Sequence, residues 1–176
     1  MKTVFLDRDG TIIVDPKDER VDSIEKIELF PDSIEALKYL ADHYFNVVIV
    51  SNQAGIAEGR ISEPDFWKIH SVVLNKLSAS GIKVLKTYMN GEAPGAISNM
   101  RKPAPGMLLQ AAKDFSLNLS EIYIVGDSQS DIEAGINAGC KGSILVKTAT
   151  NHDVVSPDAI YTAKNLLEAV HYITDN

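Results

Sequence analysis

Short apolar runs that alternate with amphipathic segments constrain the fold of this chain more than any other feature of its sequence. We expect strands where the runs are too short for a helix, with the last strand at 141–148 and the others at residues 3–7, 45–52, 82–89 and 121–128. We expect helices where apolar residues recur at helical spacing, at residues 32–44, 62–81, 104–116, 130–139 and 162–174. Strands that alternate with helices predict an α/β fold, with a central parallel sheet covered by helices on both faces.

The composition limits what the chain can bind. Its 176 residues are 45% hydrophobic and suit a single domain that spans 1–176. A formal net charge of −7 argues against a nucleic-acid partner, because phosphate backbones attract basic surfaces. Cys140 is the only cysteine, and no apolar stretch reaches the ~18–20 residues of a membrane span. The amino-terminal stretch carries charge too early for a signal peptide, so we expect a soluble, cytoplasmic protein. We also expect it to act as a monomer.

Three of the expected strands end in polar residues. Asp7 lies at the end of the first strand, Ser51 at the end of the second and Asp127 at the end of the fourth. In parallel sheets, ligands bind at the carboxyl ends of the strands, where the strand order reverses. We therefore expect these three side chains to face one crevice.

The stretch "DRDGT" places two aspartates two residues apart at the end of the first strand. Most loop aspartates are turn and cap residues, and Asp7 and Asp9 can be interpreted in that way. Two neighbouring carboxylates also repel each other unless a cation or a ligand lies beside them. The functional interpretation, which we favour, gives them separate tasks. One attacks an electrophile and the other transfers a proton, while a hard cation keeps the first ionised.

Three further stretches carry polar side chains at or near strand ends. "VSNQAG" offers a hydroxyl and two amides that suit phosphate oxygens. "MRKPAPG" contains Arg101 and Lys102, which on their own would be interpreted as a solvated basic pair. "IVGDSQSDIEAG" contains Asp127 and Asp131, which can equally be a helix cap and a first-turn acid. Each stretch is a weak signal alone, and their combination is specific.

In this order, D-x-D-G-T, Ser, Lys and G-D-x-x-x-D form the motif set of the haloacid dehalogenase-like (HAD) phosphatases, which the chain resembles over nearly its whole length. The resemblance implies a three-layer, Rossmann-like fold and an aspartyl phosphate on Asp7. Asp9 would protonate the leaving oxygen and then deprotonate the attacking water. The implied Mg²⁺ ligands are the carboxylates of Asp7 and Asp127 and the backbone carbonyl of Asp9.

The resemblance also implies which residues bind the substrate. Ser51 and Lys102 would hold the phosphoryl oxygens, and Asp131 would orient Lys102 or a metal-bound water. Further substrate contacts are implied for Asp15, Asn52, Gln53, Arg101 and Ser128.

The connections between the motifs are too short for a separate cap domain, so we expect an open site in which loops choose the substrate. A mutase, which must shield its intermediate from water, is therefore not favoured. "SNQAGIAEGR" and "RKPAPGMLLQAA" resemble the heptose-1,7-bisphosphate phosphatases, which implies a small sugar phosphate such as heptose 1,7-bisphosphate. "DPKDERVDSIEKIELFP" resembles the histidinol-phosphate phosphatases, which leaves histidinol phosphate as an alternative. A catalytically inactive domain that binds phosphorylated ligands is the alternative from a different class.

Two features depart from both families. Their members usually carry a zinc loop before R-K-P in C-x-H…C-x-C spacing, and here Met89, Gly91, Ser98 and Met100 stand at those positions. Glycine and serine are poor zinc ligands, so we expect no zinc, and a contact between Met89 and Met100 that closes the loop. Ser128 stands where relatives commonly have a Lys or Arg that could meet a distal phosphate or carboxylate.

Overall fold

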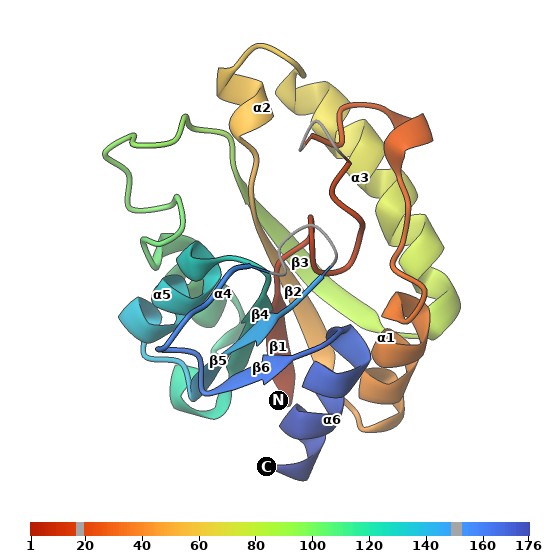
Figure 1. Ribbon diagram of the computed structural model, residues 1–176, viewed down its shortest axis with the longest axis vertical. Coiled ribbons are helices and arrows are strands. Elements are labelled where there is room, and N and C mark those ends of the chain that lie inside the picture. Colours follow the sequence, from red (N-terminus) through yellow and green to blue (C-terminus); the bar gives the residue numbers. More distant parts are fainter. Residues whose placement is uncertain (17–19, 149–152) are drawn as a thin grey trace.

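The computed structural model describes residues 1–16, 20–148 and 153–176, which form a sheet between two layers of helices (Figure 1). The strands are β1 (Thr3–Leu6), β2 (Asn46–Asn52), β3 (Lys83–Asn90), β4 (Tyr123–Gly126), β5 (Gly142–Val146) and β6 (Tyr161–Ala163). The helices are α1 (Ser33–Asp42), α2 (Ala54–Ala57), α3 (Glu63–Leu77), α4 (Gly106–Phe115), α5 (Gln129–Ala138) and α6 (Leu166–Asp175). Short 3-10 turns lie at Ile24–Lys26, Ser78–Ser80 and Leu119–Glu121.

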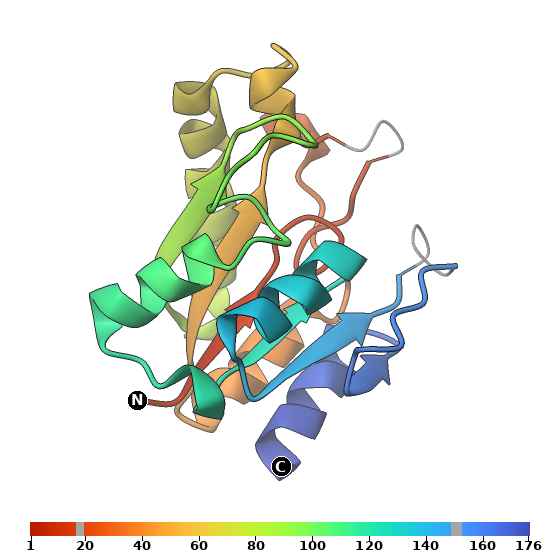
Figure 2. The ribbon, with the colours of Figure 1, turned by 90° about the vertical axis from the view of Figure 1, so that its left-hand side faces the viewer.

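The strands described pair in parallel, in the order β3-β2-β1-β4-β5-β6. The chain first builds outward from β1 through β2 to β3, and then crosses to the other side of β1 to begin β4. The strand order therefore reverses between β1 and β4, where doubly wound sheets open a crevice for ligands. Figure 2 shows the sheet from the side, with its strands running the same way.

Both faces of the sheet are buried, and successive residues of a strand alternate between them. Val4 and Leu6 of β1 pack toward α1, α3 and α6, whereas Phe5 packs toward α4 and α5. Figure 1 shows these two groups of helices on opposite sides of the sheet. Parallel strands covered on both faces are apolar throughout, which is why "TVFL" and "VVIV" showed no polar alternation in the sequence.

The carboxyl-terminal part of the chain corrects one prediction. The run at 141–148 contains β5, but it is not the last strand, because β6 follows and pairs with β5. The helix expected at 162–174 begins instead at Leu166, and its first two expected residues belong to β6. Asn165 sets this start, because its side chain accepts the backbone N–H of Glu168 at 2.8 Å. A strand of three residues is too short to show a periodic pattern.

The other expected strands and helices are confirmed, with ends that differ by a few residues. α3 begins where Ser62 accepts the backbone N–H of Asp65 at 3.2 Å, and the segment ends at Gly81 with φ of 75°. The sequence did not predict α2, which is only four residues long. Among the described residues, no helix combines the length and the apolar character needed to cross a membrane.

Candidate active site

The carboxyl ends of β1 and β4 bring Asp7 and Asp127 together. The backbone N–H of Asp7 donates to the carbonyl of Val125 at 2.9 Å, just beyond the paired residues of the two strands. Gly10 then turns the chain with φ of 80°, and a Cβ at this position would lie 2.1 Å from Oδ2 of Asp127. Glycine alone satisfies both the positive φ and the close approach, which explains its place in D-x-D-G-T.

Lys102 lies at the floor of the crevice, with a side chain only 2% exposed. Its Nζ donates to Oδ1 of Asp7 at 2.6 Å, to the carbonyl of Val50 at 2.7 Å and to Oδ1 of Asp131 at 2.5 Å. An ammonium group has three N–H donors, and each has an acceptor here. Burial alone would lower the pKa of Lys102, but the carboxylates of Asp131 and Asp7 outweigh burial and raise it. Lys102 is therefore a fixed positive charge.

Asp7, Asp127 and Asp131 form a carboxylate cluster in which one oxygen from each residue lies within 4.8 Å of the others. Burial raises the pKa of Asp7 to about 8, with Lys102 opposing the shift and the nearby carboxylates adding to it. Burial and the charge of Asp7 likewise raise the pKa of Asp127 to about 9. Protein groups alone therefore disfavour the ionised forms. Carboxylate oxygens suit Mg²⁺, so a divalent cation fits this cluster and would favour ionisation.

Asp9 is oriented by a buried arginine and by a glutamine that lines the crevice. Its carboxylate accepts two hydrogen bonds from the guanidinium of Arg8, at 2.9 and 2.8 Å, and one from Nε2 of Gln53 at 2.6 Å. The hydroxyl of Ser51 is a more distant donor, at 3.4 Å. Arg8 is completely buried, and its guanidinium lies 4.8 Å from the ring centre of Phe66 in α3. The side chain of Asp9 is still 18% exposed, so it reaches the cavity in the orientation that these hydrogen bonds fix.

Asn52 positions the loop segment that carries Lys102. Its amide oxygen accepts the backbone N–H of Lys102 at 3.1 Å, and its Nδ2 donates to the carbonyl of Lys102 at 3.0 Å. Both ends of the amide are therefore engaged with the loop. The sequence predicted Asn52 as a substrate contact and gave no sign of this structural task.

The start of α5 places Asp131 against Lys102. Oδ2 of Asp131 accepts the backbone N–H of Ser128 at 3.1 Å and its hydroxyl at 2.5 Å, while Oδ1 accepts from Lys102. A Cβ at Gly126 would lie 2.3 Å from Cβ of Asp131, so glycine lets the helix approach the end of β4 this closely. Asp131 is thus a first-turn acid that caps α5 and also a residue that contacts Lys102, because its two carboxylate oxygens serve these purposes separately.

A cavity of about 200 Å³ lies at these strand ends. The predicted residues that line it are Asp7, Asp9, Asp15, Asn52, Gln53, Arg101, Lys102, Asp127, Ser128 and Asp131. Ser51 lies just outside this set, since it is 1% exposed and accepts a hydrogen bond from Gln53 at 2.8 Å. The structure thus brings the predicted side chains to one place.

The sequence missed two arginines of this region. Arg8 orients Asp9, and Arg20 lines the cavity itself. The position of Arg8 inside D-x-D-G-T was visible, but nothing local indicated that its side chain turns inward. Arg20 belongs to a charged stretch that the family resemblance places beside the crevice, but no motif in that stretch singles out this residue.

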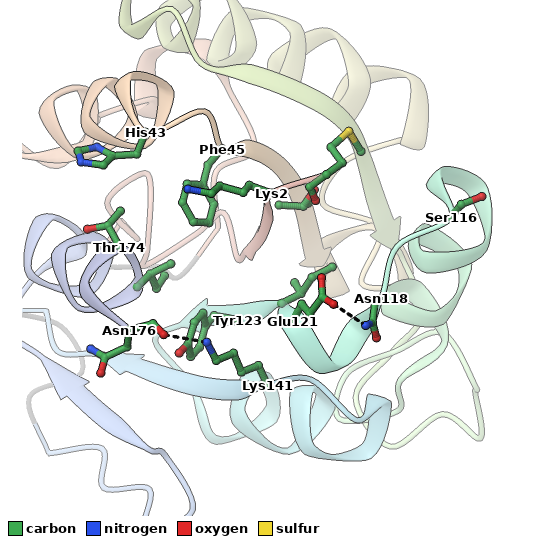
Figure 3. Close-up of a pocket in the computed structure, with 14 residues that line it drawn as sticks. Lys2, His43, Phe45, Ser116, Asn118, Glu121, Tyr123, Lys141, Thr174 and Asn176 are labelled. Atoms are coloured by element: carbon green, nitrogen blue, oxygen red, sulfur yellow. Dashed lines mark hydrogen bonds between the residues drawn. The ribbon is translucent and has the colours of Figure 1, made fainter.

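A second cavity, of about 440 Å³, lies at the opposite, amino-terminal end of the strands (Figure 3). Its two lysines are already engaged. Nζ of Lys2 lies 5.3 Å from the ring centre of Phe45, and Nζ of Lys141 lies 4.9 Å from that of Tyr123 and donates to the carbonyl of Asn176. None of the residues predicted from the sequence lines this cavity, so the smaller one is the candidate active site.

The chain is similar to known proteins along most of its length. The HAD-hydrolase-like family model matches residues 99–169, the part that holds Lys102 and the G-D-x-x-x-D stretch. The D-glycero-alpha-D-manno-heptose-1,7-bisphosphate 7-phosphatase of Campylobacter jejuni is 34% identical over 174 residues, which cover 99% of this chain and 96% of that protein. The bifunctional histidine biosynthesis protein HisB of Spirosoma linguale is 32% identical over 147 residues, or 82% of this chain. The chain spans only 38% of the length of that HisB protein.

A solved structure is similar over the whole fold. The D,D-heptose 1,7-bisphosphate phosphatase from B. bronchiseptica, complexed with magnesium and phosphate, matches with a TM-score of 0.90 and 28% sequence identity, over 99% of both chains.

Proposed function

The chain belongs to the HAD-like phosphatase family, and on this basis we propose that it is a Mg²⁺-dependent phosphomonoesterase acting on a small phosphorylated sugar. The observation that carries the proposal is the placement of Lys102 between Asp7 and Asp131, with Asp127 in the same carboxylate cluster. Phosphoryl transfer requires in-line positioning and neutralised equatorial oxygens, and this arrangement can supply both.

Each residue at the floor has a task in this proposal. Asp7 attacks phosphorus and the P–O bond to the leaving group breaks, which leaves an aspartyl phosphate. Asp9 donates a proton to the leaving oxygen and later takes one from the water that hydrolyses the aspartyl phosphate. Lys102 holds the phosphoryl oxygens together with the hydroxyl of Ser51, and Asp131 fixes the direction of the lysine.

The proposed metal ligands are the carboxylates of Asp7 and Asp127 and the backbone carbonyl of Asp9. Their oxygen chemistry suits Mg²⁺, which when bound neutralises charge on the nucleophile and the phosphoryl oxygens. The raised pKa values of Asp7 and Asp127 support this assignment, since buried carboxylates this close need a counter-charge to ionise.

Heptose 1,7-bisphosphate is the substrate we favour, because relatives named for it match along nearly the full length of the chain. The remaining substrate contacts proposed are Asp15, Asn52, Gln53, Arg101 and Ser128, which line the cavity. Histidinol phosphate is the second candidate, because histidine biosynthesis proteins are also among the relatives.

Hydrolysis assays test the proposal. Purified protein is incubated separately with heptose 1,7-bisphosphate, histidinol phosphate and p-nitrophenyl phosphate. Each reaction is run once with excess chelator and once with excess Mg²⁺, and phosphate release is measured. We expect phosphate release to depend on Mg²⁺ and to be fastest from heptose 1,7-bisphosphate. Binding without release from any ester would favour the inactive ligand-binding domain instead.

We further propose a single catalytic domain over residues 1–176 that acts as a cytoplasmic monomer, without a cap and without zinc. The short connections on either side of Ser51 support the absence of a cap, and the lack of good zinc ligands at Gly91 and Ser98 supports a zinc-free loop. In that loop, the hydroxyl of Ser98 accepts the backbone N–H groups of Met100 and Arg101, at 3.1 and 3.3 Å. Metal analysis that finds one tightly bound zinc per chain, or a dimer in gel filtration, would contradict these proposals.

A further inference from the structure

The rim of the candidate active site carries an arginine that is tied to a carboxylate. Nη2 and Nε of Arg20 donate to the two oxygens of Glu58 at 2.7 and 3.1 Å. Arg20 comes from the connection between β1 and α1, and Glu58 is the residue that ends α2. The pair therefore links two separate segments above the cavity that Arg20 lines.

Arg20 is held in place by packing as well as by this ion pair. Its side chain crosses α2 at Gly55, where a Cβ would lie 3.4 Å from Cδ and 3.8 Å from Nε of the arginine. A guanidinium whose stem already packs against the protein loses little further freedom when it binds an anion. Arg20 is thus preorganised at the rim.

Glu58 lies among three arginines. Hydrogen bonding from Arg20 lowers the pKa of Glu58, and the charges of Arg60 and Arg101 act in the same direction. Burial and the charge of Arg20 together lower the pKa of Arg101, so these two guanidinium groups repel each other. Arg20 and Arg101 both line the cavity, so their positive charge favours an anionic group at this part of its rim.

Glu58 can exchange partners without becoming unpaired. Its Oε2 also lies 3.4 Å from Nε of Arg60, an arginine that does not line the cavity. If a ligand takes Arg20, the charge of Glu58 remains neutralised by Arg60. The exchange therefore avoids the cost of leaving a carboxylate unpaired.

We propose that Arg20 is a specificity-determining residue which exchanges Glu58 for a second anionic group, a phosphate or carboxylate, on the substrate. The inference rests on the proposed phosphatase function and deepens it, because it predicts a lower KM for phosphate esters that carry a second negative group. Lys102 neutralises the phosphoryl group being transferred at the floor, while Arg20 binds the distal anion at the rim with Arg101 nearby. Paired N–H donors of a guanidinium match the geometry of phosphate and carboxylate oxygens.

The test compares two variants on two substrates. Arg20→Gln removes the proposed contact, and Arg60→Gln is the matched control, since it removes an arginine that contacts the same glutamate outside the cavity. Heptose 1,7-bisphosphate carries a second phosphate, whereas p-nitrophenyl phosphate has none. We expect Arg20→Gln to raise KM for the bisphosphate by about tenfold, with kcat unchanged and p-nitrophenyl phosphate turnover unaffected. Arg60→Gln should leave both substrates within about twofold of wild type.

Glu58→Gln provides a second, independent measurement. Because Glu58 competes for Arg20, this variant should lower KM for the bisphosphate and leave p-nitrophenyl phosphate unchanged. Equal effects of Arg20→Gln on the two substrates, or no effect on either, would overturn the inference while the phosphatase function stands. Absence of hydrolysis of every ester by the wild-type protein would instead overturn the proposed function.

Discussion

Nζ of Lys102 donates to Oδ1 of Asp7 at 2.6 Å, although 95 residues separate the two in the sequence. Both side chains are almost completely buried, and Asp131 accepts from the same ammonium. Burying a lysine is costly unless nearby carboxylates match its charge, and Asp7 and Asp131 do so here. It also makes the proposed chemistry open to direct tests.

Asp7→Asn should abolish hydrolysis, with a fall in kcat of at least about a thousandfold, because an amide cannot attack phosphorus. Asp131 still accepts from Lys102 in this variant, and the amide oxygen of asparagine can accept from the same ammonium in place of Oδ1 of Asp7. Thermal unfolding without Mg²⁺ should therefore be no easier than for wild type. Asp42→Asn, at an exposed position at the end of α1, is the control and should retain full activity. Substantial turnover by Asp7→Asn would remove the nucleophile from the proposal.

Asp9→Asn should slow turnover in proportion to how much the leaving group needs a proton. Alkyl phosphates such as sugar phosphates have poor leaving groups, so their kcat should fall by about 10²–10⁴-fold. p-Nitrophenolate leaves without a proton, so that substrate should be affected less. KM should change little for either, since Asp9 is held by Arg8 and Gln53 rather than placed to bind the ester. A pure loss of affinity with kcat intact would contradict proton transfer by Asp9.

Mg²⁺ should bind more tightly at pH 9 than at pH 6. The pKa values of Asp7 and Asp127 lie at about 8 and about 9, so at pH 6 both carboxyls hold protons that the cation must displace. Calorimetric titration with MgCl₂ at the two pH values measures the difference, and binding at pH 6 should release protons into the buffer. Asp127→Asn should weaken binding strongly at both values. Affinity independent of pH would argue that the cation does not contact these carboxylates.

His70 should make the protein less stable in mild acid. Burial, together with the charge of Arg8, lowers its pKa from 6.5 to about 4, so the unfolded chain binds the proton more readily than the native protein does. Stability is therefore full above about pH 6.5 and decreases as the pH falls toward 4. At pH 5 the loss should be about 2 kcal/mol, from about 1.5 units of pKa at 1.36 kcal/mol each.

Urea unfolding of wild type and His70→Gln at pH 7 and pH 5 isolates this contribution. Glutamine can keep a donor toward the hydroxyl of Thr87, which lies 2.7 Å from Nε2 of His70. The variant should lose less stability than wild type between the two pH values. Identical losses would show that His70 does not carry the effect.

Local sequence was sufficient to predict most of the fold and the gathering of the polar strand ends at one cavity. The apolar runs of β1 and β2 and the helical spacing of α1 and α3 depend on neighbouring residues, so they can be recognised without contacts. Alternating strands and helices then predict that the strands run parallel, which brings the strand ends that carry Asp7 and Asp127 to one edge of the sheet.

Tertiary packing determined several features that the local sequence pattern did not predict. β6 is a strand only because β5 offers it an edge, and α6 starts where Asn165 caps it. Arg8 turns inward because its guanidinium packs on the ring of Phe66 and hydrogen-bonds to Asp9. Arg20 reaches the cavity because α2 has no side chain at Gly55. The pairing of β6 with β5 and the contacts of Arg8 with Phe66 and of Arg20 with Gly55 join segments distant in the chain, and their energies depend on burial and matched charge rather than on the identity of adjacent residues.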